Sequence, residues 1–98
     1  MKAMKKVEVI VESVYLNRLL EMFKAKGVEN YTLMKDVEGR GGHGLKLADD
    51  ITDVCSNDYF FTLVEEEKFL GLKEEIRTFV KRYGGKCIIS DVMVILSQ

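Results

Sequence analysis

The sequence predicts an α+β domain whose strands and helices follow one another in the order βαββαβ. Apolar and polar residues alternate over residues 5–12, which is the period-two pattern of a strand with one buried face. Two further stretches place apolar residues three or four positions apart, and each ends at glycine, as amphipathic helices do. The 98 residues contain eight glycines and no proline, so glycine marks the breaks. This length predicts a single domain, residues 1–98, with one small core.

The first half of the chain predicts a strand, a helix and a second strand. After the strand at 5–12, Ser13 occupies the position expected of a helix N-cap. Leucine and phenylalanine residues follow at helical spacing until Gly27 provides a left-handed stop. Alternation resumes at Asn30 and predicts a second strand that ends at Gly39.

The second half predicts a long loop, a strand, a helix and a closing strand. The polar stretch at 40–58 is long for a domain of this size, and we expect it to be flexible and functional. Aromatic and β-branched residues at 59–65 predict the third strand. A helical stripe then ends at Gly84 and Gly85, and residues 86–96 predict the last strand. The stripe consists of Phe69, Leu72, Ile76, Phe79, Val80 and Tyr83.

This order of elements packs as a four-stranded antiparallel sheet with both helices on one face, the ferredoxin-like arrangement. Apolar residues are then left over for the face without helices, and an exposed apolar face of that size predicts association. We therefore expect a homo-oligomer, although the loop at 40–58 could cover the face instead. The residues expected on this face are Ile10, Met34, Phe60, Cys87, Ile89, Met93 and Ile95.

Composition excludes several classes of function. Fifteen Lys and Arg residues against 16 Asp and Glu give a net charge of −1, without the basic excess of a nucleic-acid-binding protein. No apolar run approaches the roughly 20 residues that span a bilayer. Two cysteines, Cys55 and Cys87, with no leader and no Cys-x-x-Cys pair, predict reduced thiols in the cytoplasm. A redox role would require these two thiols to come within disulfide distance.

Two glycine-containing segments are candidates for phosphate binding. Four of the six residues at 39–44 are glycine, and Gly84-Gly85-Lys86 precedes the last strand. Glycine lets backbone N–H groups approach phosphate oxygens closely, and lysine adds a positive charge. Neither segment fits a known phosphate-loop pattern, so glycines that serve only in turns and helix ends are the alternative interpretation.

The pattern also resembles a known family. The chain carries KKVEVIVE at 5–12, GVENYTL at 27–33, Gly-x-Gly with a nearby Gly-His after the second strand, and Gly-Lys before the last. Over residues 5–96 it resembles the PII-type signalling proteins. That resemblance implies a homotrimer that binds adenine nucleotide between subunits and contacts a partner, a membrane transporter or an enzyme, through the T-loop.

The resemblance also implies roles for particular residues. Residues 40–58 correspond to the T-loop, and 84–86 to the B-loop, where Lys86 would contact phosphate. Residues 27–32 would approach the adenine, with Thr32 as the polar contact. The nucleotide-binding residues implied in this way are Thr32, Gly39, Arg40, Gly41, Gly42, His43, Gly84, Gly85 and Lys86.

Departures from the family narrow the expected ligand. The loop is shorter than in nitrogen-sensing members and has neither the tyrosine that is uridylylated nor the glutamine that helps to hold magnesium and 2-oxoglutarate. The sequence ends at Gln98, before the arginine-bearing C-terminal loop. It resembles the divergent PII-like branch associated with carboxysomes and bicarbonate transporters. We therefore expect AMP or ADP rather than ATP as ligand, with or without bicarbonate or another small anion, because fewer cations suit fewer phosphates.

A metal-responsive binding protein, similar to the trimeric CutA-like or efflux-associated proteins, is the alternative function. His43, Cys55 and the aspartates of the loop could bind a divalent metal, although their spacing matches neither zinc pairs nor a calcium loop. His43 could equally assist phosphate binding or lie solvated in the loop. No serine or cysteine has a histidine and an acid at recognisable spacing, so we expect a binding protein rather than an enzyme, with no cofactor beyond the nucleotide ligand.

Overall fold

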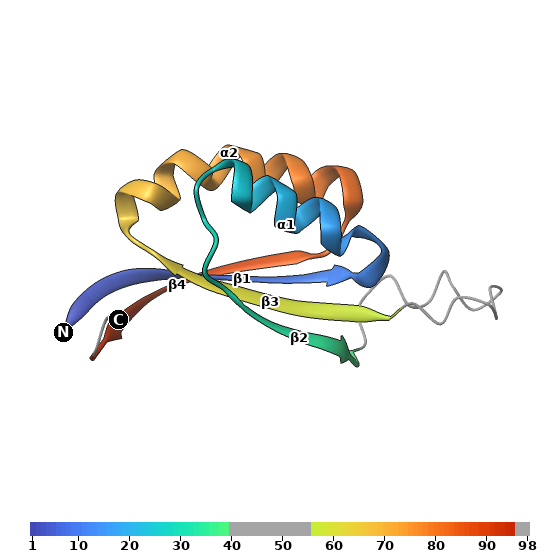
Figure 1. The fold of residues 1–98 in the computed structure, drawn as a ribbon, viewed down its shortest axis with the longest axis horizontal. Coiled ribbons are helices and arrows are strands. Elements are labelled where there is room, and N and C mark those ends of the chain that lie inside the picture. The colour runs from blue at the N-terminus through green and yellow to red at the C-terminus, as the bar shows by residue number, and fades with distance from the viewer. Residues whose placement is uncertain (40–55, 96–98) are drawn as a thin grey trace, which may run out of the picture.

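A computed structural model describes residues 1–39 and 56–95 and confirms the predicted order of elements (Figure 1). A short 3-10 helix, η1, joins the first strand to the first helix. The predicted loop at 40–58 lies largely outside the described residues, but its last two residues belong to the third strand. The elements are β1 (Lys2–Glu12), η1 (Ser13–Tyr15), α1 (Leu16–Ala25), β2 (Thr32–Val37), β3 (Asn57–Val64), α2 (Glu66–Tyr83) and β4 (Lys86–Val94).

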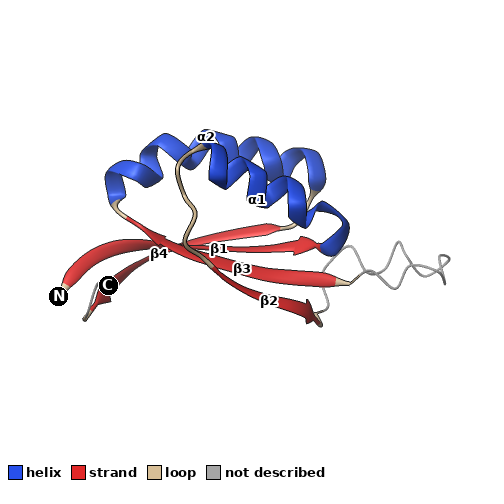
Figure 2. Ribbon diagram, viewed as in Figure 1, coloured by secondary structure: helices blue, strands red, loops and turns tan. Residues whose placement is uncertain are grey.

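The four strands form one sheet in the order β2-β3-β1-β4, with each neighbouring pair antiparallel. Both helices lie over the same face of this sheet, and the other face carries no helix of the described chain (Figure 2). The ferredoxin-like arrangement predicted from the sequence is therefore confirmed. Within the described residues, neither helix combines the length and apolar character needed to cross a membrane.

The core lies between the sheet and the two helices. Alternate residues of β1 point toward the helices and are buried, as the period-two pattern predicted. The rings of Phe23 and Phe60 stack at a centroid distance of 4.7 Å and join α1 to β3. The buried apolar residues are Val7, Val9, Val11, Leu16, Leu19, Phe23, Val28, Phe60, Val64, Leu72, Ile76 and Phe79.

The two ends of α1 show one wrong and one confirmed prediction. Ser13 is not the N-cap, because η1 intervenes and α1 begins only after Tyr15. At the other end, Gly27 has φ of +83°, which favours glycine. Its N–H donates to the carbonyl of Lys24 (2.9 Å), and the next N–H donates to that of Phe23 (2.9 Å). The helix therefore ends at Gly27 as predicted, and the chain turns toward β2.

The composition predicted for the face without helices is partly wrong. Residues directly opposite each other in an antiparallel pair lie on the same face of the sheet. Phe60 and Cys87 both pair with Val9, so they lie on the helix side; Phe60 is fully buried there. By the same register Ile89, opposite Val7, and Met93 share that side.

The face without helices is nevertheless rich in apolar groups. Met34, opposite Tyr59, is 52% exposed, and Ile88 is 44% exposed. Ile10 is half-buried on the same face, as predicted. Ile95 lies just beyond β4 and is exposed. An apolar surface therefore remains on this side of the described residues.

Charged groups on this face are paired with aromatic ones. The phenol of Tyr59 donates to Oε1 of Glu8 at 2.6 Å, and Nζ of Lys6 lies 4.7 Å from the ring centroid of Phe61. Partial removal from water and the hydrogen bond to Glu8 raise the pKa of Tyr59 to about 12. The face without helices thus combines exposed apolar side chains with paired charges.

Candidate functional site

The predicted site residues fall into three groups in the structure. Gly84, Gly85 and Lys86 form the turn between α2 and β4. Thr32 opens β2, and Gly39 follows its end. The predicted contacts Arg40, Gly41, Gly42 and His43 lie outside the described residues, as does Cys55 of the metal hypothesis.

The turn at 84–86 brings backbone against backbone. Gly84 and Gly85 have φ of +80° and +98°, and the N–H of Gly84 donates to the carbonyl of Val80 at 2.9 Å. A Cβ atom at Gly85 would lie 2.5 Å from the carbonyl oxygen of Ile10, so only glycine fits there without movement of β1. Lys86 follows at the start of β4, opposite Ile10, with its side chain exposed. The turn therefore presents exposed backbone followed directly by a cation.

A polar network lies where β2 ends and β3 begins. Asp58 is fully buried, and its Oδ1 accepts the backbone N–H of Asp36 at 3.0 Å. Asp36 has φ of +58°. Its own carboxylate accepts from the hydroxyl of Ser56 at 2.5 Å, and the carbonyl of Ser56 accepts the N–H of Ser13 at 2.8 Å. These bonds fix the described chain on both sides of residues 40–55.

The two predicted phosphate-binding segments lie at the same end of the sheet but on opposite edges. Gly39 follows β2, whereas Lys86 begins β4, and β3 and β1 separate these two strands. Three strand spacings correspond to about 14 Å. Within one chain, the described parts of these segments therefore flank the end of the sheet rather than meet.

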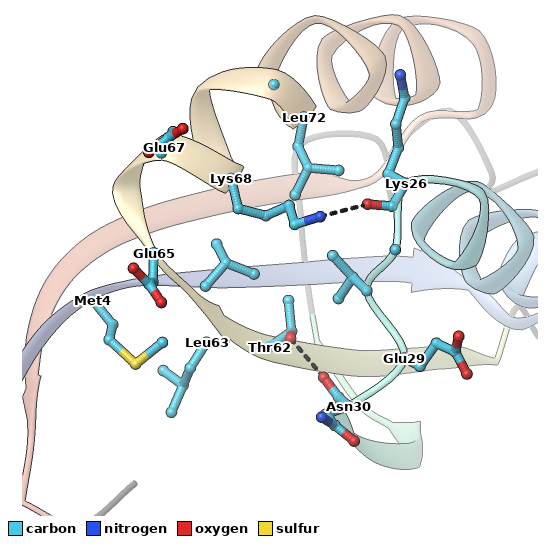
Figure 3. Close-up of a pocket in the computed structure, with 14 residues that line it drawn as sticks. Met4, Lys26, Glu29, Asn30, Thr62, Leu63, Glu65, Glu67, Lys68 and Leu72 are labelled. Atoms are coloured by element: carbon cyan, nitrogen blue, oxygen red, sulfur yellow. Dashed lines mark hydrogen bonds between the residues drawn. The ribbon is translucent and has the colours of Figure 1, made fainter.

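A pocket of about 630 Å³ lies at the opposite end of the domain. The turn after α1, the end of β3 and the first turns of α2 line it, with Met4 of β1 beside Leu63 (Figure 3). Six residues of β1 separate Met4 from Ile10, the partner of Lys86, which corresponds to about 20 Å. The pocket is therefore a second region, distant from the turn at 84–86 in the same chain.

Two hydrogen bonds shape this pocket, and both use backbone carbonyls of the segment after α1. The hydroxyl of Thr62 donates to the carbonyl of Asn30 at 2.6 Å, and Nζ of Lys68 donates to the carbonyl of Lys26 at 3.0 Å (Figure 3). The segment that sequence comparison associated with adenine, 27–30, is thereby held against β3 and α2.

The polar groups of the pocket differ from the one singled out in the sequence. Thr62 lines it from β3, whereas Thr32 lies opposite Phe61 at the start of β2 and is not among the lining residues. The lining also contains Glu29, Glu65 and Glu67. The contribution of β3 could not be found from the sequence, because only the β-sheet register brings 62–64 beside 27–30.

The metal-binding hypothesis receives no support from the part of the chain that the structure describes. No group of three or more His, Cys, Asp or Glu side chains gathers there in a way that could hold a metal ion. Cys87 packs on the helix side of the sheet, and burial, together with the charge of Glu8, raises the pKa of its thiol to about 11. A neutral thiol of this kind behaves as a small apolar side chain.

The strand order and the two separate candidate regions define the class: a ferredoxin-like domain with a glycine turn at one end and a ligand-sized pocket at the other. The family model of the nitrogen regulatory protein P-II matches residues 4–98, and the chain belongs to this family. A search of curated proteins found no match.

Solved structures of PII-like proteins share this fold. The chain is similar to CPII, a nitrogen regulatory PII-like protein from Thiomonas intermedia K12, in a structure bound to ADP, AMP and bicarbonate. The TM-score is 0.80 and the identity 23%, over 99% of this chain and 98% of that one. For CPII bound to ADP and bicarbonate the values are 0.78 and 25%, over 95% and 89%. A candidate PII-like signaling protein from Thermus thermophilus matches at 0.71 and 26%, over 95% and 90%.

Proposed function

We propose that this protein is a PII-like regulator that binds AMP or ADP in clefts between the subunits of a homotrimer. In this proposal the loop at 40–58 carries the signal to a partner protein, a membrane transporter or an enzyme. Bicarbonate or another small anion binds with the nucleotide. The protein acts in the cytoplasm by binding rather than by catalysis. Membership of the P-II family and the nucleotides bound to the CPII structures support this proposal.

The separation of the two candidate regions is the observation that carries the proposal. The turn at 84–86 and the pocket beside 27–30 lie about 20 Å apart along β1, farther than one nucleoside monophosphate extends. A nucleotide can contact both regions only if they come from neighbouring copies of the chain. The exposed apolar side chains on the face without helices supply a surface that such an assembly would bury.

The chemistry of the two regions fits the two ends of a nucleotide. The pocket contains the carboxylates of Glu29, Glu65 and Glu67, which disfavour phosphate, but its apolar walls and amide groups suit a neutral base and ribose. The turn at 84–86 offers exposed backbone and the ammonium group of Lys86, which suit phosphate. We therefore assign the base to one subunit and the phosphates to the next.

Calorimetry with AMP, ADP and ATP tests nucleotide binding. We expect the parent to bind AMP or ADP, and Lys86→Ala to lower the affinity about ten-fold or more, because it removes a charge-assisted contact. Lys73→Ala is the matched control, since Lys73 is an exposed lysine of α2 away from the turn. Absence of binding by all three nucleotides would overturn the proposed function, as would a Lys86→Ala variant that binds like the parent.

A mixing experiment tests whether the site is shared between subunits. Lys86→Ala removes the phosphate half, and Asn30→Ala weakens the base half. If each site combines halves from two chains, exchange of subunits between the two variants restores about a quarter of the sites, those built from two unaltered halves. A site contained in one chain gives no recovery. Light scattering must also report a particle of three 11.2 kDa chains, and a strictly monomeric protein would exclude a shared site.

A further inference from the structure

Two arginines converge on one tyrosine at the end of the molecule that contains the turn at 84–86. Tyr83 is the last residue of α2, and its hydroxyl accepts a hydrogen bond from Nη1 of Arg18 in α1 at 3.4 Å. The guanidinium carbon of Arg18 lies 5.5 Å from the centroid of the Tyr83 ring, and that of Arg82 lies 5.3 Å from it. One ring thus holds two cations close together. We call Arg18, Tyr83 and Arg82 the arginine cluster.

The ring of Tyr83 is itself fixed by its neighbours. Its centroid lies 4.9 Å from that of Tyr15 and 4.8 Å from that of Phe79. Tyr83 therefore packs between the start of α1 and the end of α2, and the arginines rest on an ordered aromatic support rather than extending freely into water. Such support lowers the conformational entropy that a guanidinium loses when it binds an anion.

The positive charge of the arginine cluster is not balanced within residues 1–39 and 56–95. Ion pairs among these residues engage Lys2, Lys5, Lys6, Lys26 and Arg77, whereas neither arginine of the cluster nor Lys86 has a carboxylate within 4 Å. A cation–π contact leaves the charge of the guanidinium in place. The end of the domain around the turn at 84–86 is thus locally cationic, although the whole chain has a net charge of −1.

Helix stability explains only one of the two arginines. Arg82 lies in the last turn of α2, where the helix dipole favours a cation. Arg18 is the third residue of α1, in the first turn, where the dipole disfavours a cation, and that turn contains no acidic residue. A charge that is unfavourable for its own helix and has no described counterion needs another explanation, and an anionic ligand supplies one.

We infer that the arginine cluster binds the terminal phosphoryl group of a nucleoside diphosphate whose first phosphate lies at the turn formed by Gly84, Gly85 and Lys86. Tyr83 and Arg82 directly precede this turn in the chain. Guanidinium groups bind phosphate through paired N–H donors, so two of them can hold the oxygens that AMP lacks. This inference rests on the proposed function and deepens it: the cluster makes the site prefer ADP to AMP.

Calorimetry with ADP and AMP tests the inference. The parent should bind ADP more tightly than AMP. The double variant Arg18→Gln, Arg82→Gln should lose about ten-fold or more in ADP affinity and less than about three-fold in AMP affinity. The double variant Arg18→Lys, Arg82→Lys, which keeps the charge but not the paired donors, should lie between them. Arg77→Gln is the control, because this exposed arginine of α2 already pairs with Glu74 at 3.8 Å.

The outcomes separate this inference from the proposed function. If the glutamine double variant binds ADP like the parent, or loses ADP and AMP affinity equally, the arginine cluster does not bind the terminal phosphoryl group, although nucleotide binding itself stands. If the parent binds neither nucleotide, both proposals fail. Thermal unfolding of each variant shows whether the fold is intact, so that a selective loss of ADP affinity can be assigned to the missing guanidinium groups.

Discussion

Replacing Gly85 with alanine should destabilise the protein more than the same change at its neighbour Gly84. Both glycines have positive φ, and placing a side chain in such a conformation costs about 1–3 kcal/mol. At Gly84 no atom lies within 4 Å of the added Cβ, so we expect a loss of about 2 kcal/mol. At Gly85 the Cβ would lie 2.5 Å from the carbonyl oxygen of Ile10, which cannot rotate away as a side chain can. Overpacking of this kind adds about 1–3 kcal/mol.

Urea unfolding at one fixed protein concentration measures this difference, since an associating protein gains apparent stability with concentration. We expect Gly85→Ala to lose about 3–5 kcal/mol of unfolding free energy and to melt well below Gly84→Ala, because each kcal/mol corresponds to roughly 4–8 °C for a domain of this size. Gly39→Ala, with φ outside the left-handed region and nothing within 4 Å of its Cβ, should be nearly neutral. Equal stabilities for Gly84→Ala and Gly85→Ala would refute the close approach of the turn to β1.

Three other predictions follow from burial. Phe60→Ala should cost about 3–5 kcal/mol in urea unfolding, because the side chain is fully buried, and Phe61→Ala, on the face without helices, clearly less; the reverse order would contradict the register of β3. Because its pKa is raised to about 11, Cys87 in a Cys55→Ser background should react slowly with iodoacetamide at pH 8, and its rate should rise about ten-fold per pH unit with no plateau below pH 10. Asp58→Ala should lower stability by about 1–3 kcal/mol, since it leaves a backbone N–H without its acceptor, and a stability equal to that of the parent would show that this bond contributes nothing.

Local sequence signals predicted the order of elements because each depends on near neighbours in the chain. The alternation in β1 and the glycine after α1 are properties of a few consecutive residues, and both predictions are confirmed. Ser13 was misassigned because a hydroxyl before a helix is only a preference, and here η1 is placed between them. In the structure its hydroxyl instead donates to that of Ser56, 43 residues away.

Which face of the sheet a residue occupies could not be obtained in the same way. A shift of one residue in register moves every side chain of a strand to the other face, so an apolar strand such as β3 can be read in either sense. Phe60 and Cys87 were assigned to the wrong face for this reason, and only their common pairing with Val9 settles the matter. Asp58 is similar: it was read as a loop residue, and the pairing of β3 with β1 buries it.

The candidate site divides along the same line. From the sequence alone came the glycine turn, Lys86 and the segment at 27–30, because glycine and lysine carry their conformational and charge properties wherever the fold places them. Only the tertiary structure showed that the turn and the pocket lie at opposite ends of the sheet, that Thr62 and Lys68 complete the pocket, and that Arg18 and Arg82 meet at Tyr83. Those relationships join residues up to 65 positions apart, and strand pairing and helix packing determine them, not the order of residues along the chain.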